Sequence, residues 1–128
     1  MTKFFRTVLT GSPAGTGTAD ATYINADTPA DPVDVFYGIE GQLDAAAPSG
    51  SPTTPTLDVI VQATHDGTNW WTVLTFTQKT TGAGVEQKQA LRTASVSLGT
   101  RYRVKASVGT ASGTATYAIS VTLLLWSM

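Results

Sequence analysis

The segment from Leu57 to Thr77 constrains the fold of this chain more than any other. It contains two runs, residues 57–64 and 70–77, in which apolar and polar side chains alternate. Successive side chains of a β-strand point to opposite faces, so each run is typical of a strand with one buried face. Asp66-Gly67 between the runs supplies the positive φ that a tight turn needs. The segment therefore predicts a β-hairpin.

Similar patterns recur along the chain. Residues 3–9, 21–26, 33–43, 101–108 and 117–125 are predicted as strands, and residues 96–98 as a short one. Residues 85–91 fit either a short helix or an exposed edge strand. The alternation predicts four rows of side chains that share one face, and in the segment of residues 33–43 it places Phe36 on the opposite face from its row. The four rows are Leu57, Val59, Val61 and Ala63; Val33, Val35, Tyr37 and Ile39; Tyr102, Val104, Ala106 and Val108; and Tyr117, Ile119, Val121, Leu123 and Leu125.

About eight strands, Gly-rich turns and no predicted helix indicate an all-β protein built as an antiparallel β-sandwich. Eight strands fit a jelly roll, and an immunoglobulin-like sandwich is the alternative. A chain of 128 residues suits one domain, over residues 1–128. Within it we predict an N-terminal arm in residues 1–20 and a Pro-rich loop over residues 44–56.

The composition is poor in charge. Charged residues make up 13% of the chain, against about 25% in an average soluble domain. Threonine is abundant instead. A protein surface solvated by hydroxyl groups repels other protein molecules only weakly, which favours assembly. The alternative is an ordinary Thr-rich β-sandwich, which has the same composition. With a net charge of −1, we expect no nucleic-acid partner and no attraction to an anionic membrane. No signal peptide is recognised, and the longest apolar run, residues 123–126, is too short to span a bilayer.

The chain offers no recognisable reaction chemistry. His65 is the only histidine, no cysteine is present, and neither a nucleophile motif nor a zinc-binding set appears. Asp20, Asp27, Asp31 and Asp34 gather in sequence and are compatible with a calcium site, but turn capping by their side chains is the favoured interpretation. We therefore expect no enzymatic activity, no metal and no cofactor.

Two groups of residues are candidates for binding a partner. Trp70 and Trp71 are adjacent, so a strand places one inward and one outward, where a tryptophan can stack on a sugar or anchor a protein. Arg101, Arg103 and Lys105 form a basic row on one face of their strand. Tyr102 points to the opposite face, which argues against stacking of nucleic-acid bases beside these charges. We expect this row to be a solvated face, or to pair with carboxylates of a neighbouring strand or subunit.

The run LDVIVQATHDGTNWWTVLTFT, followed by GTRYRVKASVGTASGTATYAISVTLLL, resembles small β-sandwich structural proteins of tailed bacteriophages, above all head decoration (capsid cement) proteins. The resemblance covers about residues 57–125. It implies a non-enzymatic protein, made in the host cytoplasm, that binds the outer surface of an assembled capsid and reinforces contacts between capsomers. Its implied partners are the major capsid protein and itself, as a homotrimer.

The resemblance directs attention to seven residues for partner binding. Phe4, Phe5 and Arg6 would form an apolar and cationic anchor near the N-terminus, with an ordinary core strand as the alternative role for the phenylalanines. Trp71, Arg101, Arg103 and Lys105 complete the set. Three other functions stay open. One is another phage tail or surface component. A carbohydrate-binding module would use an exposed Trp70 or Trp71. A hydrolase would need carboxylates around His65.

Overall fold

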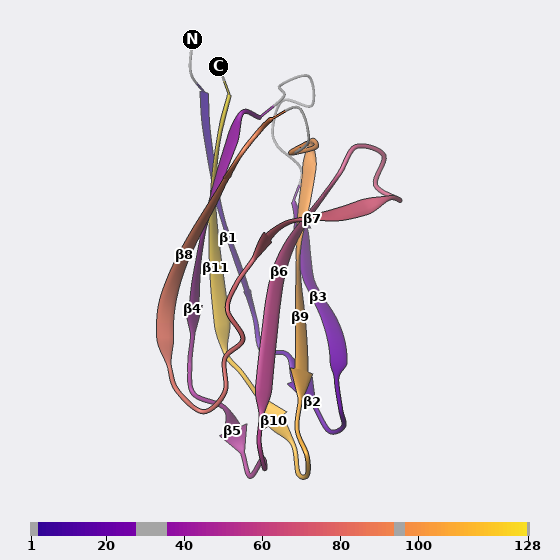
Figure 1. Cartoon of the computed structure of the whole chain (residues 1–128), viewed down its shortest axis with the longest axis vertical. Helices are drawn as coiled ribbons and strands as arrows, with labels where there is room; N and C mark the ends of the chain where they lie inside the picture. The colour runs from indigo at the N-terminus through magenta and orange to yellow at the C-terminus, as the bar shows by residue number, and fades with distance from the viewer. Residues whose placement is uncertain (1–2, 28–35, 94–96, 128) are drawn as a thin grey trace.

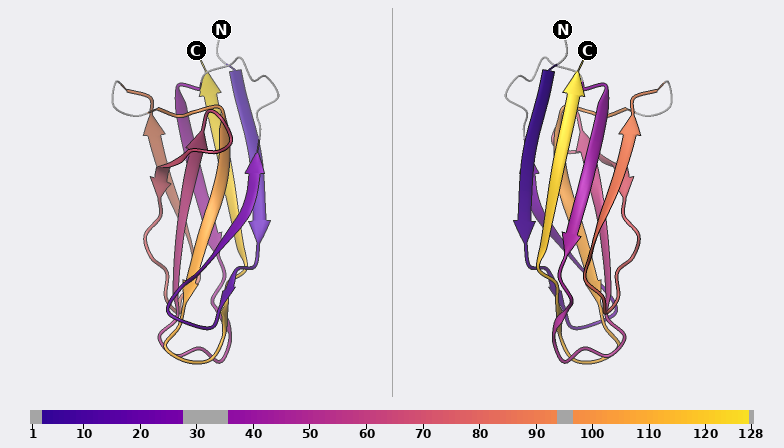
Figure 2. Two further views of the ribbon diagram at one scale, coloured as in Figure 1. Left: turned by 90° about the vertical axis from the view of Figure 1, so that its right-hand side faces the viewer. Right: turned by 90° about the vertical axis from the view of Figure 1, so that its left-hand side faces the viewer.

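The computed structural model describes residues 3–27, 36–93 and 97–127. In this part of the chain every regular element is a β-strand, and the strands run along the length of an elongated body (Figures 1 and 2). The strands are β1 (Lys3–Gly11), β2 (Ala14–Gly15), β3 (Asp20–Asp27), β4 (Gly38–Ala45), β5 (Ser49–Gly50), β6 (Thr56–Thr64), β7 (Trp70–Thr75), β8 (Gly84–Leu91), β9 (Arg101–Gly109), β10 (Ala115–Thr116) and β11 (Ile119–Ser127).

The eight long strands form two antiparallel sheets that pack face to face. The first sheet has the order β1-β11-β4-β8 and the second has the order β3-β9-β6-β7. The chain crosses between the sheets at nearly every connection, and only the β6–β7 hairpin joins sequence neighbours within one sheet. This double Greek-key order is that of the eight-strand jelly roll. The predicted all-β sandwich is thus confirmed in its jelly-roll form.

A third, small sheet closes one end of the sandwich. Its order is β2-β10-β5, and it lies at the end opposite the chain termini (Figure 1). At the other end Lys3 is in register with Ser127, so the first residue of β1 lies beside the last residue of β11. The small sheet corrects one sequence expectation. The predicted Pro-rich loop over residues 44–56 contains the end of β4, all of β5 and the first residue of β6.

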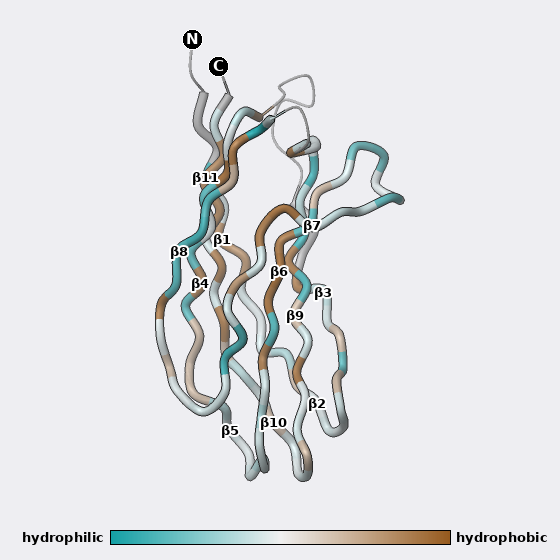
Figure 3. Tube along the Cα trace, viewed as in Figure 1, coloured by the Kyte–Doolittle hydropathy of each residue, from teal (hydrophilic) through white to brown (hydrophobic). Residues whose placement is uncertain are grey.

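The core lies between the two long sheets, and hydrophobic residues alternate with polar ones along the strands that enclose it (Figure 3). Three of the predicted inward rows are confirmed, because each of their side chains is at most 4% exposed. The buried residues of these rows are Leu57, Val59, Val61, Ala63, Tyr102, Val104, Ala106, Val108, Tyr117, Ile119, Val121, Leu123 and Leu125.

The fourth predicted row is wrong where it meets the start of β4. Tyr37 was expected to share the inward face of Ile39, yet Tyr37 is 41% exposed and Phe36 is buried. The strand begins only at Gly38, so the alternation does not continue back through these two residues. The ring of Phe36 packs edge-on against Tyr102 of the second sheet, with the ring centroids 6.0 Å apart. Val33 and Val35 lie outside the described residues.

Residues 85–91 form an edge strand, which decides between the two structures predicted for them. β8 pairs with β4 over eight residues and is mostly hydrophilic (Figure 3). Its Glu86 is opposite Leu43 in register and therefore faces the interior side of the sheet. There it forms an ion pair with Lys79. An inward-pointing charge on an edge strand discourages pairing with another chain along that edge.

Candidate interaction surfaces

The outer face of the second sheet carries a cluster of one arginine and two aromatic rings. Arg103 projects outward from β9, and its guanidinium carbon lies over the ring of Tyr23, 4.0 Å from the centroid. The same carbon lies over the ring of Trp70, 4.2 Å from that centroid. Tyr23 comes from β3 on one side of β9, and Trp70 comes from β7, beyond β6 on the other side. We call these three residues the arginine clamp.

Neighbouring polar groups hold the arginine clamp in place. The Nε group of Arg103 donates a hydrogen bond of 2.9 Å to Oε1 of Gln62, the residue opposite it on β6. Lys105, one outward position further along β9, has its Nζ 5.8 Å from the centroid of the Tyr23 ring. An arginine stacked on aromatic rings gains cation–π attraction and loses little hydration, because guanidinium is weakly hydrated. The cluster is therefore ordered before any partner arrives.

The β6–β7 turn next to the arginine clamp is built around the carboxylate of Asp66. Oδ1 of Asp66 accepts hydrogen bonds of 2.8 Å from the backbone amides of Asn69 and Thr68. The Asn69 side chain and the Thr64 hydroxyl donate further hydrogen bonds to this carboxylate. Together these bonds outweigh the small cost that burial adds to ionisation, and they hold the pKa of Asp66 well below its ordinary range. Gly67 has φ = +78°, as the turn chemistry predicts. Asp66 is thus a structural residue of the turn.

The two adjacent tryptophans have different roles. Trp70 lies on the outer face in the arginine clamp. Trp71 is opposite Ala63, packs against the core and donates a hydrogen bond of 2.7 Å from Nε1 to the carbonyl oxygen of Ser97. His65 is exposed, its ring centroid lies 5.2 Å from that of Trp71, and its Nε2 is 3.2 Å from the Ser97 hydroxyl. No carboxylate among the described residues completes a catalytic set around this histidine.

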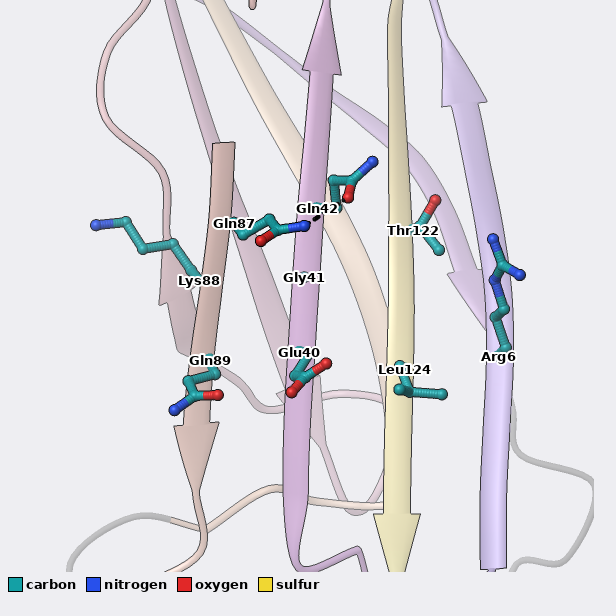
Figure 4. A pocket seen from close by; sticks show the side chains of 9 residues that line it. All are labelled: Arg6, Glu40, Gly41, Gln42, Gln87, Lys88, Gln89, Thr122 and Leu124. Atoms are coloured by element: carbon teal, nitrogen blue, oxygen red, sulfur yellow. Dashed lines mark hydrogen bonds between the residues drawn. The ribbon is translucent and has the colours of Figure 1, made fainter. Parts of the chain in front are cut away.

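The outer face of the first sheet has an open depression of about 550 Å³. Figure 4 shows its side chains in rows across the strands: Arg6 from β1, Thr122 and Leu124 from β11, Glu40 and Gln42 from β4, and Gln87 and Gln89 from β8. Nε2 of Gln87 donates a hydrogen bond of 2.9 Å to Oε1 of Gln42. Amide and hydroxyl groups dominate this face, so it offers hydrogen bonds with little net charge.

The structure separates the residues predicted to bind a partner. Arg101, Arg103 and Lys105 share the outer face of the second sheet, whereas Arg6 is on the outer face of the first sheet. Phe4 and Phe5 belong to β1, which pairs along its whole length with β11, and their side chains lie outside the described residues. Their role in binding, and that of an arm within residues 1–20, stay predictions.

The basic row has neighbours that differ from those expected. The sequence predicts that these cations are solvated or form ion pairs with carboxylates. The structure places aromatic rings beside Arg103 and Lys105. The hairpin pattern leaves open which of Trp70 and Trp71 faces outward, and Trp71 is the one predicted to bind a partner. The structure places Trp70 on the outer face and packs Trp71 against the core. Tyr23 was not singled out, because nothing in its own segment indicates that β3 pairs with β9.

The cluster of aspartates in the sequence does not form a metal site in the described part of the chain. Asp20 and Asp27 are at opposite ends of β3, while Asp31 and Asp34 lie outside the described residues. No group of three or more potential metal ligands occurs among the residues described, and these residues include no helix suited to crossing a membrane.

Comparison with known proteins identifies the fold. No protein-family model and no curated protein matches the sequence. The structure of the infectious bursal disease virus Gx strain is similar, with a TM-score of 0.65 and 8% identity over 98% of this chain and 32% of that chain. The VP2 subviral particle of the same virus gives a TM-score of 0.61 and 11% identity, over 98% and 36% of the two chains. The PBSX exported protein XepA gives 0.56 and 12%, over 93% and 36%.

This chain therefore spans about a third of the length of those proteins. At such low identity the likeness establishes a shared jelly-roll fold, and function has to be argued from the surfaces.

Proposed function

We propose that this protein is a non-enzymatic structural component of a phage virion, which binds the outer surface of the assembled capsid and reinforces contacts between capsomers. The observation that carries the proposal is the jelly roll, which matches a chain of the infectious bursal disease virus VP2 subviral particle over 98% of the present chain. In this proposal the protein is made in the host cytoplasm and is located on the capsid surface.

The character of the two outer faces supports an assembly role. The first sheet presents amide and hydroxyl groups from Gln42, Gln87 and Thr122 around a shallow depression. These neutral groups can form hydrogen bonds to a neighbouring subunit and are less expensive to desolvate than charged groups. The second sheet presents Arg103 and Lys105 beside aromatic rings, and arginine and aromatic residues are enriched at protein interfaces.

In the proposed assembly the protein is a homotrimer and its main partner is the major capsid protein. The basic row Arg101, Arg103 and Lys105 is assigned to the capsid, and Phe4, Phe5 and Arg6 to a sister subunit or to the capsid. Trp71 contributes by holding the segment at Ser97 in place beside the β6–β7 hairpin.

The test uses purified protein and heads of the phage that encodes it, prepared without it. Analytical ultracentrifugation is expected to give the mass of a trimer, and the protein is expected to sediment with the heads at saturable stoichiometry. Replacement of both cations, R103Q with K105Q, is expected to weaken retention, whereas R92Q, at an exposed arginine directly after β8, serves as the control for loss of one charge. A strict monomer that never sediments with heads contradicts the proposal.

A glycan-binding role is the second candidate, and one observation favours it. Tyr23 is 50% exposed and lies on the same outer face as the half-buried Trp70, so two aromatic rings lie close to hydrogen-bonding groups on one surface. If this role is correct, the wild-type protein gives signals on a glycan array, and Tyr23→Ala and Trp70→Ala each abolish those signals. Tyr37→Ala, at another exposed tyrosine, is the control and leaves the signals unchanged. Unchanged signals in the first two variants rule it out.

A further inference from the structure

The arginine clamp has the geometry of a receptor for an anion. Tyr23 and Trp70 reach Arg103 from strands on either side of β9, with both ring centroids within 4.2 Å of the guanidinium carbon. Stacking of this kind fixes the plane of the guanidinium. Its Nε group is engaged by Gln62, and the remaining donors are the two Nη groups in the same plane. A planar pair of N–H donors matches the two oxygens of a carboxylate.

The described residues supply no carboxylate to the arginine clamp. Glu86 is paired with Lys79 and Lys88 near the β8 edge. Asp58 is on the same outer face but accepts hydrogen bonds of 3.0 and 3.2 Å from the Gln78 amide. Asp66 is engaged by the amides of its own turn. None of these described carboxylates is therefore placed to bind Arg103.

The spacing of the cations indicates the shape of that molecule. Arg101, Arg103 and Lys105 occupy alternate positions of one regular strand, and alternate residues of a strand are about 6.6–6.8 Å apart. An extended polypeptide with acidic residues at alternate positions has the same repeat. When it lies along β9, such a segment places one carboxylate near Arg103 and the next near Lys105.

We propose that the outer face of β9 binds an extended acidic segment of a protein partner, with one carboxylate held by the arginine clamp. This deepens the proposed function, on which it rests, by naming the chemistry of the partner. A nucleic-acid strand fits less well, because Arg103 already lies over the rings on which bases would stack. Three cations in a chain of net charge −1 also give a polyanion weak attraction.

The test uses synthetic peptides and the whole protein. One peptide alternates Glu and Thr, and a second has the same composition with all Glu residues in one block. Binding is followed by calorimetry and by the tryptophan fluorescence that Trp70 contributes. We expect the alternating peptide to bind about fivefold more tightly than the block peptide, and its affinity to fall as NaCl is added.

Matched variants separate the arginine clamp from charge alone. Arg103→Lys keeps the charge but loses the planar donor pair, and is expected to weaken binding of the alternating peptide about tenfold. Tyr23→Leu removes one ring and is also expected to weaken binding. Arg92→Lys, at an exposed arginine directly after β8 of the first sheet, is expected to leave binding unchanged. Circular dichroism checks that each variant is folded.

Several results overturn the proposal. One is the absence of peptide binding, and another is equal affinity for the two peptides. Equal effects of Arg103→Lys and Arg92→Lys also overturn it, as does tighter binding of oligothymidylate or heparin than of the alternating peptide. Retention on phage heads without peptide binding contradicts this inference alone. Peptide binding without retention on heads contradicts the proposed capsid role alone.

Discussion

The indole Nε1 of Trp71 donates a hydrogen bond of 2.7 Å to the carbonyl oxygen of Ser97, which ties the β6–β7 hairpin to the segment that leads into β9. Trp71→Phe removes the donor and keeps an aromatic ring. We expect the free energy of unfolding, measured by urea denaturation, to fall by about 0.5–1.5 kcal/mol. Trp70→Phe is the control, because its ring contacts Arg103 and a phenyl ring preserves that contact. An equal loss in both variants contradicts a specific role for the Trp71 hydrogen bond.

Glu86 makes the stability of the protein depend on pH. Burial opposes ionisation of the Glu86 carboxyl group. Hydrogen bonds from Lys79 and from the amide and hydroxyl of Thr77, with the charge of Lys79, outweigh this effect of burial. Together they lower the pKa of Glu86 from about 4.5 to about 2. A carboxyl group whose pKa is lower in the folded state stabilises the fold above its unfolded pKa and loses that effect as the pH falls through its folded pKa. We expect the free energy of unfolding to decline between about pH 5 and pH 2.

Glu86→Gln tests this assignment. The variant is expected to lose about 1–3 kcal/mol at pH 7, because a charged acceptor of several hydrogen bonds is removed. It is also expected to show a shallower decline towards pH 2 than the wild type, with a residual slope from Asp66, whose pKa is lowered too. Glu40→Gln, on the outer face of β4, is the control. Identical pH profiles for Glu86→Gln and the wild type would falsify the role of Glu86.

Gly38 is required by the ring of Trp126. The two residues are in register on β4 and β11, and a Cβ atom added at Gly38 would overlap the indole. Gly38→Ala is therefore expected to lower the free energy of unfolding by about 1–3 kcal/mol, as overpacking does. Gly84→Ala is a matched strand control, because a Cβ there meets nothing within 4 Å. Thermal melts of the two variants that shift equally would contradict this explanation.

Leu123 and Thr122 are neighbours on β11 that face opposite sides of the first sheet. Leu123 is fully buried between the sheets, and Thr122 lines the depression on the outer face. We expect Leu123→Ala to cost about 2–5 kcal/mol of unfolding free energy. Thr122→Ala is expected to cost less than about 1 kcal/mol. Chemical denaturation measures both, and similar losses would be incompatible with the register of β11.

The sequence by itself determined which residues of most strands face inward. The rows beginning at Leu57, Tyr102 and Tyr117 are buried as their alternation predicts, because the period of two is a local property of an extended chain. The prediction is wrong at Phe36 and Tyr37, where no strand has yet begun and the contact with Tyr102 of the other sheet decides which ring is buried.

Only the tertiary structure decided which strands are neighbours, and with them the candidate site. The sequence predicts Arg103 on an outer face and one of Trp70 and Trp71 facing outward, without deciding which. The contact between Arg103 and Trp70 requires that β9 lie beside β6 and its hairpin. Tyr23 joins them because β3 pairs with β9, with a bulge next to Tyr23 that shifts the register. Alternation specifies the two faces of a strand but carries no information about its distant partner, so sheet order follows from how the whole core packs.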